Sequence, residues 1–306
     1  MRKFASHYNE NSYEIVNERE DKVVLKSPYP VEYRESSNIY LYTYPSRGTK
    51  GTLLFVHGLG RRNLKYLKYF PEQFSKLGYS SALMILPYHF DRTPQGFKSG
   101  ELFLNTTDND TLRSRFEHAT VDVLTSLDYL RDKYGYPLYL MGYSFGGMIS
   151  TIAAAFRNDL SGLSLVVCGG NFRYITWESV ATKVFRVQYE QNEECSRERC
   201  KKLHSQENFY RYISQLESPH IELNTAPMKC YEYDPLVFAK FVKTKVIMFT
   251  ALFDVFIPFK ASDELYRHLK SPQKKRYLLP AGHITSFLLW RKFIVRSTDR
   301  FFKKGG

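Results

Sequence analysis

Short apolar runs alternate with helix-period segments along most of the chain. Eight runs rich in β-branched and aromatic residues predict strands, at residues 23–26, 39–44, 52–56, 79–86, 138–141, 163–168, 245–250 and 276–279. Runs this short and this continuously apolar are typical of strands that are buried on both faces, as in a parallel sheet.

Helical patterns lie between these runs. The clearest covers residues 112–134, where apolar residues recur every three or four positions and a glycine follows as a stop. Residues 144–156 are apolar nearly all round, which predicts a central helix on the sheet, and residues 284–302 predict a final helix with a basic face. Residues 63–77 are amphipathic but contain Pro71, which predicts two short helices or one with a break. The alternation predicts an α/β fold, a mostly parallel twisted sheet flanked by helices.

One stretch interrupts this alternation. From about residue 171 to residue 241 the sequence is polar and helix-prone, with scattered aromatic residues and charge clusters. About seventy residues are too many for a plain loop in a compact domain. We therefore expect a helical cap insertion at residues 171–241, over a core made of residues 1–170 and 242–306.

The sequence Gly142-Tyr143-Ser144-Phe145-Gly146-Gly147 follows a predicted strand and opens an apolar helix. A G-x-S-x-G motif in this context predicts a sharp strand-to-helix turn. Its glycines avoid collisions with the neighbouring strand and helix, and the turn lifts the serine hydroxyl clear of the sheet. Ser144 is therefore the candidate nucleophile.

A serine hydroxyl needs a base, and the base needs an orienting acid. His283 follows a strand end and a small-residue turn, which places it on the same edge of the sheet as Ser144. Asp254 follows the strand predicted at residues 245–250 and is the candidate acid. Asp234 and Asp263 are competitors, but Asp234 lies within the cap and Asp263 falls in the next predicted helix.

Acyl transfer also needs hydrogen-bond donors for the oxyanion. The Phe145 N–H, directly after the nucleophile, is one candidate. The loop after the strand at residues 52–56 offers Leu59, with Gly60 as an alternative. His57 in that loop is expected to be structural.

Residues 87–94 follow a strand and are expected at the rim of the site. His89 and Arg92 could contact a polar or anionic part of the substrate. The favoured alternative is a loop held by an internal network of Asp91 and Arg92.

Cys195, Cys200 and His204 have a spacing that resembles a metal site. A fourth ligand is missing from the segment, which is highly charged, so no metal is expected. The four cysteines of the chain are too few and too irregular for a disulfide scaffold, which fits a reducing compartment.

Composition adds little to this assignment. The 306 residues carry a formal net charge of +13, which could attract anionic substrates, lipid or nucleic acid. A solvated basic surface is the favoured explanation, because lysine and arginine are spread along the whole chain. No nucleic-acid-binding module is visible. The N-terminus lacks the apolar stretch of a signal peptide and no window is long enough to span a membrane, so a soluble, cytoplasmic protein is expected.

The order Ser144, Asp254, His283, the elbow GYSFGG and the loop HGLG resemble the α/β-hydrolase superfamily, from about Gly51 to the C-terminus. Within it, LPYHFDRTPQGFKSGE and the cap are similar to bacterial dienelactone-hydrolase-like proteins and the α/β-hydrolase domain-containing 18 group. Ala251 departs from the glycine that many relatives have before the acid. The resemblance implies hydrolysis of esters, thioesters, amides or peptides without a cofactor, and we expect a small-molecule ester or amide as the substrate.

Three functions remain open at this stage. The first is a carboxylesterase-like serine hydrolase that forms an acyl-enzyme on Ser144. The second is an acyltransferase with the same triad, and the third is a non-catalytic binding protein on a hydrolase scaffold. The third is the weakest, because every triad position is filled.

Overall fold

The computed structural model describes residues 2–48, 50–60, 63–191 and 195–303. These residues form a nine-stranded sheet with the order β1-β2-β3-β5-β4-β6-β7-β8-β9. The strands are β1 Ile15–Glu18, β2 Lys22–Lys26, β3 Asn38–Tyr44, β4 Thr52–Val56, β5 Ser80–Ile85, β6 Leu138–Tyr143, β7 Leu160–Val166, β8 Val246–Ala251 and β9 Lys274–Leu279.

The sheet is parallel from β5 to β9 and antiparallel at its N-terminal edge. Strands β1, β2 and β3 pair antiparallel with one another, and β3 pairs antiparallel with β5. The predicted fold class, a mostly parallel sheet flanked by helices, is confirmed. In the parallel part Val56 pairs with Gly142, and Gly142 pairs with Leu165. The carboxyl ends of the central strands are therefore level, and the loops that follow them meet at one edge.

Alternate residues of each strand point to two separate hydrophobic clusters. On β4, Leu54 and Val56 belong to one cluster, whereas Leu53 and Phe55 belong to the other. Both faces of the sheet are covered, so the central strands are buried throughout, as the continuous apolar runs predicted.

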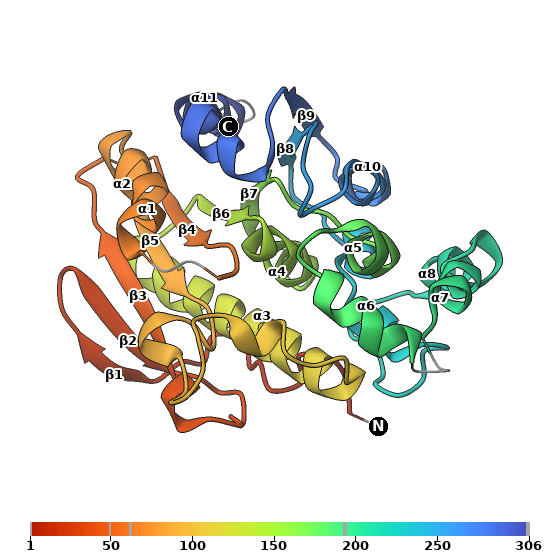
Figure 1. Cartoon of the computed structure of the whole chain (residues 1–306). Coiled ribbons are helices and arrows are strands. Elements are labelled where there is room, and N and C mark those ends of the chain that lie inside the picture. The colour runs from red at the N-terminus through yellow and green to blue at the C-terminus, as the bar shows by residue number, and fades with distance from the viewer. Residues whose placement is uncertain (1, 49, 61–62, 192–194, 304–306) are drawn as a thin grey trace.

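Helices cover the two faces of the sheet as shown in Figure 1, where α2 and α11 lie on one side and α3 and α4 on the other. The bounds of the helices that flank the sheet are α1 Leu64–Leu67, α2 Tyr69–Lys76, α3 Asn109–Tyr134, α4 Phe145–Ala155, α10 Phe259–His268 and α11 His283–Lys303. The break predicted from Pro71 falls at Lys68, and the proline lies in the first turn of α2, where the missing N–H costs little.

Helix α3 is buried along most of its length, including its polar side chains. The N-terminal segment packs over it, and Arg2 forms an ion pair with Glu117, while the Tyr8 hydroxyl donates to Asp128 at 2.9 Å. Buried charges are tolerated where they are paired and hydrogen-bonded. The apolar stripe predicted for this helix therefore covers only part of its buried surface.

In the described residues between β7 and β8, where the sequence predicted a helical cap insertion, there are seven short helices. They are α5 Phe172–Glu178, α6 Lys183–Glu190, α7 Arg197–Leu203, η4 Gln206–Tyr210, α8 Arg211–Gln215, η5 Lys229–Tyr233 and α9 Pro235–Ala239. Trp177, Phe185, Tyr189 and Cys200 form a small core of their own. Helix α9 instead packs with α4 in the larger cluster. The division into a core and a cap at residues 171–241 stays a prediction.

Strand β1 was not predicted. All four of its residues are exposed, so it lacks the apolar run or alternation that indicates a strand. Of the helices in the described ranges, none is both long and apolar enough to cross a membrane.

Candidate active site

Ser144 lies at the turn between β6 and α4 in a backbone conformation that is rare for a residue with a side chain, with φ 55° and ψ −122°. The flanking glycines are required by close approach. A Cβ on Gly142 would lie 2.4 Å from the Gly146 carbonyl oxygen, and a Cβ on Gly146 would lie 2.2 Å from the Val56 carbonyl oxygen. The strained turn is therefore fixed by packing, and it leaves the Ser144 side chain facing a cavity.

His283 and Asp254 are in direct contact. The Nδ1 atom of His283 lies 2.7 Å from Oδ2 of Asp254. The other carboxylate oxygen, Oδ1, accepts hydrogen bonds of 2.9 Å from the backbone N–H groups of Phe256 and Ile257. Because a carboxylate only accepts, Nδ1 of a neutral His283 carries the proton and Nε2 is left as a base.

The two competing carboxylates have other partners. Asp234 is buried at the N-terminus of α9 and accepts from the backbone N–H groups of Asn171, Phe172 and Leu236. Its burial raises the pKa of the carboxyl to about 6. Asp263 pairs with Arg276 at 2.6 Å. Asp254 is thus the one of the three carboxylates that contacts the histidine.

Ser144 and His283 line the same cavity. Among the described residues no hydrogen bond joins the two side chains. Serine–base hydrogen bonds are often long in the free form of such sites and shorten when substrate binds. Tyr143 links the two loops, because its hydroxyl lies 2.8 Å from the backbone carbonyl oxygen of His283.

The two candidate oxyanion donors line the same cavity as Ser144. Phe145 is the first residue of α4, so its N–H has no partner within the helix. The Leu59 N–H has no partner among the residues that the structure describes, and both Leu59 and Phe145 line the cavity. The alternative donor, Gly60, directs its N–H to Nε2 of His89 at 3.4 Å.

His89 is buried beneath this loop and does not line the cavity. Its Nδ1 donates to the Pro87 carbonyl oxygen at 2.8 Å, so Nε2 is the acceptor for Gly60. Burial lowers the pKa of His89 to about 4 and keeps it neutral. Gly100 packs against this pair, since a Cβ there would lie 2.5 Å from Nε2 of His89. The prediction that His89 contacts substrate does not agree with this placement. His89 instead supports the loop that carries Leu59.

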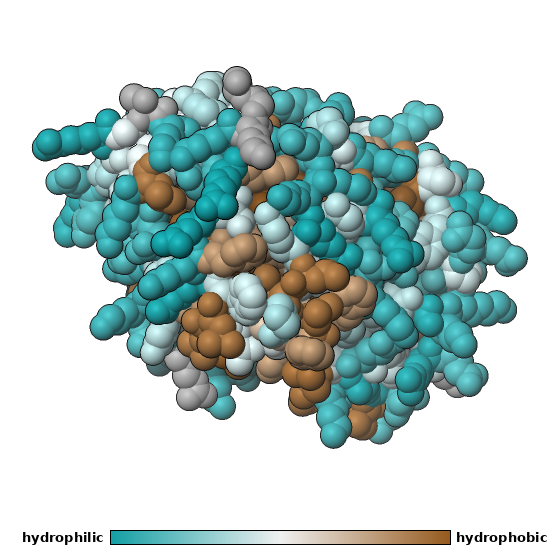
Figure 2. All heavy atoms as spheres, turned by 90° about the horizontal axis from the view of Figure 1, so that it is seen from above, coloured by the Kyte–Doolittle hydropathy of each residue, from teal (hydrophilic) through white to brown (hydrophobic). Residues whose placement is uncertain are grey.

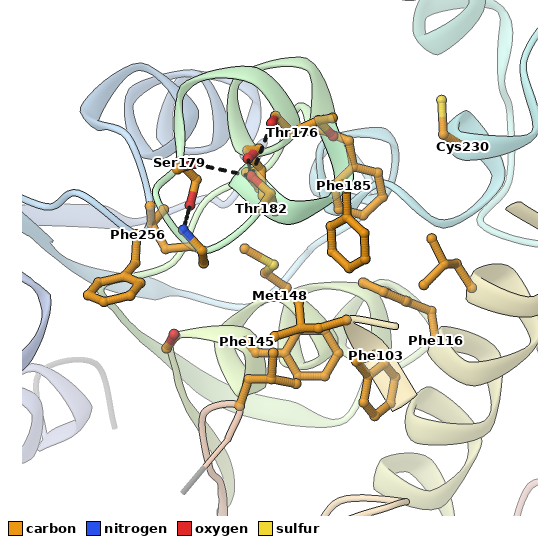
Figure 3. A pocket seen from close by; sticks show the side chains of 18 of the residues that line it. Phe103, Phe116, Phe145, Met148, Thr176, Ser179, Thr182, Phe185, Cys230 and Phe256 are labelled. Carbon is orange, nitrogen blue, oxygen red and sulfur yellow. Dashed lines mark hydrogen bonds between the residues drawn. The ribbon is translucent and has the colours of Figure 1, made fainter. Parts of the chain in front are cut away.

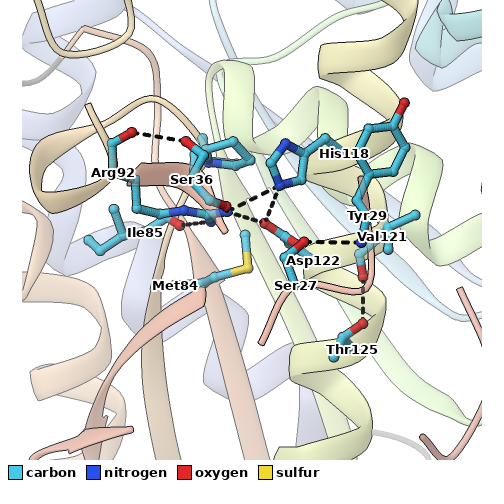
Figure 4. A network of polar contacts seen from close by, with 12 residues as sticks. Ser27, Tyr29, Ser36, Met84, Ile85, Arg92, His118, Val121, Asp122 and Thr125 are labelled. Carbon is cyan, nitrogen blue, oxygen red and sulfur yellow. Dashed lines mark hydrogen bonds and ion pairs between the residues drawn. The ribbon is translucent and has the colours of Figure 1, made fainter. Parts of the chain in front are cut away.

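Arg92 is also fully buried and lies in the polar network of Figure 4. Its guanidinium donates to Asp122 at 2.5 Å and to the carbonyl oxygens of Ile85 and Ser36, each at 2.8 Å. Asp91, the partner that the sequence suggested, is exposed and pairs with Lys22. Arg92 therefore forms a structural ion pair with Asp122 on α3. This placement does not agree with the substrate role expected for Arg92 or with the expected Asp91–Arg92 network.

The cavity above Ser144 has a volume of about 460 Å³, within the range of small-molecule sites. Figure 3 shows rings of Phe103, Phe116, Phe145 and Phe185 around it, with Met148 between them and Cys230 toward its far side. The floor comes from α4 and the wall from α3, while α5 and α6 form the roof. The space is therefore enclosed mostly by apolar side chains.

Cys195, Cys200, Cys230 and His204 lie at the part of the cavity lined by the short helices. The Nδ1 atom of His204 contacts the Cys200 carbonyl oxygen at 3.0 Å, and burial lowers the pKa of His204 to about 4. Burial also raises the pKa of Cys230. No metal-binding group of three or more His, Cys, Asp or Glu side chains is present in the described part of the chain.

Sequence reasoning missed most of the residues that support this site. Tyr143, at the end of β6, was not singled out, and His89 was expected to contact substrate rather than to support the loop of Leu59. The cavity residues Met148, Phe103 and Phe116 have the pattern of ordinary core positions. One signal was available for Tyr143, because it directly precedes Ser144 in the motif.

The sheet order, the level strand ends and the strand–helix turn at Ser144 define an α/β-hydrolase fold. No protein-family model and no curated protein matches the sequence. Solved structures match the fold. They include an acetyl xylan esterase from Paenibacillus sp. R4, with TM-score 0.63, 15% identity, and coverage of 98% of this chain and 90% of that chain.

Two further structures agree. A cold-adapted esterase from an Arctic intertidal metagenomic library matches with TM-score 0.56, 14% identity, and coverage of 94% of this chain and 98% of that chain. The α/β hydrolase GrgF from Penicillium sp. sh18 matches with TM-score 0.55, 17% identity, and coverage of 87% and 94%. The chain has the α/β-hydrolase fold that its sequence predicted.

Proposed function

We propose that this protein is a serine hydrolase that cleaves carboxylic esters through an acyl-enzyme on Ser144. The observation that carries the proposal is the 2.7 Å hydrogen bond between His283 and Asp254, on loops that meet beside the strained Ser144 turn. The fold shared with esterases supports the same class of reaction, although fold alone does not fix function.

In the first half-reaction the Ser144 hydroxyl attacks the ester carbonyl carbon and its proton passes to Nε2 of His283. Asp254 stabilises the imidazolium that forms. The oxyanion accepts hydrogen bonds from the N–H groups of Leu59 and Phe145. The C–O bond then breaks, and the alcohol leaves with the proton from His283.

In the second half-reaction water attacks the acyl carbon as His283 takes its proton. The bond between the acyl carbon and the Ser144 oxygen then breaks, His283 returns the proton to that oxygen, and the carboxylic acid leaves. The same triad would serve a thioester or an amide. An ester is favoured because the cavity next to Ser144 is lined mainly by aromatic and aliphatic side chains, which suit an apolar acyl group. The substrate is then a small-molecule ester, and the steps need no cofactor.

A fluorophosphonate probe tests the nucleophile directly. The intact protein should be labelled at Ser144, and Ser144→Ala should not be labelled. Ser150→Ala is the matched control, because Ser150 is a buried serine on α4 that does not line the cavity. A folded protein that is not labelled would contradict the proposal.

Kinetics with p-nitrophenyl esters test the triad as a unit. Ser144→Ala and His283→Ala should each lower kcat by up to roughly 10⁶-fold, and the double variant should lose little more, because either loss disables the same step. Additive losses would contradict the roles assigned here.

A further inference from the structure

Exposed hydrophobic side chains are concentrated at one edge of the molecule. Ten of the sixteen large hydrophobic side chains that are exposed in the described part of the chain lie in residues 180–187, 252–259 and 284–289. Among them Val184 is 76% exposed, Phe253 is 68% exposed and Leu289 is 72% exposed. We call the exposed hydrophobic side chains of these three segments the apolar rim.

The three segments are joined to one another. The Val180 N–H donates to the Val255 carbonyl oxygen at 2.8 Å, and the Phe253 N–H donates to the Ala281 carbonyl oxygen at 3.0 Å, two residues before α11. In Figure 2, which looks onto the side of the molecule where α11 and α10 lie, brown hydrophobic residues gather in the lower middle of the view among teal hydrophilic ones. The three segments of the apolar rim are thus adjacent on the surface, and their exposed side chains are clustered rather than scattered.

The apolar rim also adjoins the cavity above Ser144. Each segment contributes a residue that lines this cavity, namely Thr182, Phe256 and Ile284. Exposed apolar surface gathered at one place marks an interaction site on a protein. The partner that covers the apolar rim would therefore lie next to this cavity.

Lysines stand beside the apolar rim. Lys183 adjoins Val184 on α6, and Lys292 lies one turn after Leu288 on α11, both exposed. Neither forms an ion pair with any residue that the structure describes. A third lysine, Lys260, lies 3.8 Å from Glu178. A partner that binds the apolar rim therefore has to offer apolar groups to the exposed hydrophobic side chains and negative charge to the lysines.

We propose that the apolar rim docks on the surface of an anionic phospholipid bilayer. Lysines beside exposed aliphatic and aromatic residues match a surface that has acyl chains beneath anionic headgroups, and the net charge of +13 adds attraction over a longer range. A second copy of this chain fits less well, because a symmetric contact through the same patch would bring Lys183 and Lys292 close to their own copies. Docking does not depend on the chemistry at Ser144, and it would open the cavity toward esters held in the lipid.

Vesicle flotation with full-length Ser144→Ala tests docking without turnover. The protein should float with vesicles that contain phosphatidylglycerol, should float much less with pure phosphatidylcholine vesicles, and should be released as salt rises. Floating equally with both vesicles, or with neither, would overturn the proposal.

Matched variants locate the contact. Leu288→Ser with Leu289→Ser should weaken vesicle binding by about ten-fold or more, since two apolar side chains leave the lipid. Ile15→Ser with Val16→Ser is the control, because these exposed residues lie on the outermost strand at the other edge of the sheet. Equal losses in both pairs would contradict docking through the apolar rim.

Charge is tested in the same way. Lys183→Gln with Lys292→Gln should weaken binding to anionic vesicles and reduce its salt dependence, whereas Lys3→Gln with Lys26→Gln should change both less. Hydrolysis of soluble p-nitrophenyl acetate should be unchanged in the Leu288, Leu289 variant, which shows that the site is intact. Light scattering that showed a dimer disrupted by this variant, together with unchanged vesicle binding, would assign the apolar rim to a second copy instead.

Discussion

The hydroxyl of Tyr143 donates a 2.8 Å hydrogen bond to the backbone carbonyl oxygen of His283, 140 residues further along the chain. Tyr143 directly precedes Ser144, and His283 is the first residue of α11. The bond therefore ties the turn that carries the candidate nucleophile to the loop that carries the candidate base. The Ser286 hydroxyl also contacts the same carbonyl oxygen, at 2.6 Å.

Replacing Tyr143 tests whether this bond positions the base. Tyr143→Phe should lower kcat/KM by about five-fold, the effect of losing roughly 1 kcal/mol of hydrogen bonding. The thermal midpoint should change little, because the ring still packs and Ser286 still donates to the carbonyl. Tyr139→Phe, on the same strand but away from the loop, is the control. A rate equal to that of the unmodified enzyme would assign Tyr143 to packing alone.

Replacing Asp254 by asparagine should lower kcat by about 10⁴-fold, the size of the effect in serine proteases. Asp254 Oδ1 accepts two backbone N–H groups, so an asparagine would keep its oxygen there and turn its amide N–H group toward His283. Nδ1 would then have to accept, which moves the imidazole proton to Nε2 and blocks the base.

Asp263→Asn provides the comparison for this substitution, since Asp263 pairs with Arg276 on the neighbouring strand. It should retain the rate of the unmodified enzyme. Steady-state kinetics on a p-nitrophenyl ester measure both variants, and a loss below ten-fold in Asp254→Asn would contradict its role.

The parts of the molecule that were predictable from sequence are those with a local signal. Strands such as β4 and β8 were predicted to within a residue because both of their faces are buried, which leaves a continuous apolar run. The three candidate triad residues each follow such a strand or open the next helix, so their common edge followed from the order of elements. The short helices between β7 and β8 have too few turns to show a period.

Tertiary partners were not predictable in the same way. Asp91 and Arg92 are neighbours in sequence, yet Asp91 points to solvent and Arg92 to the interior, where its partner Asp122 lies thirty residues further on. Phe253 and Leu289 show the converse problem. Their hydrophobicity suggests core positions, and only the structure shows that they are exposed.

His89 should affect the oxyanion loop without touching substrate. His89→Phe removes the acceptor for the Gly60 N–H, which frees the loop that carries Leu59, and should lower kcat by about ten-fold to a hundred-fold with a smaller change in KM. His89→Gln keeps an acceptor and should recover part of the rate. Circular dichroism confirms folding, and equal kcat in the two variants would assign the effect to packing.

Filling the far side of the cavity should shorten the acyl group that fits. Cys230 lines the cavity and is nearly buried, so Cys230→Phe should lower kcat/KM for the longest accepted p-nitrophenyl ester by about ten-fold and leave the acetyl ester unchanged. Cys230→Ser keeps the size of the side chain and is the control. If both esters lose activity equally, the acyl group does not occupy this part of the cavity.

Acid should destabilise the fold through His118, which is fully buried on α3 between Arg92, Asp122, Tyr88 and Tyr29. Burial lowers the pKa of His118 to about 4, against 6.5 as its ordinary value. Between these two values the unfolded chain binds a proton that the native chain does not, so the free energy of unfolding is highest above pH 6.5 and falls as pH drops toward 4.

Urea denaturation at pH 7.5 and pH 5 measures this loss. His118→Phe should reduce the difference in unfolding free energy between the two pH values by on the order of 1–2 kcal/mol. Part of the difference should remain, because burial also lowers the pKa of His89 and His204 to about 4. A His118→Phe protein with an undiminished pH dependence would mean that His118 is protonated in the native state, with Asp122 as the group that stabilises its charge.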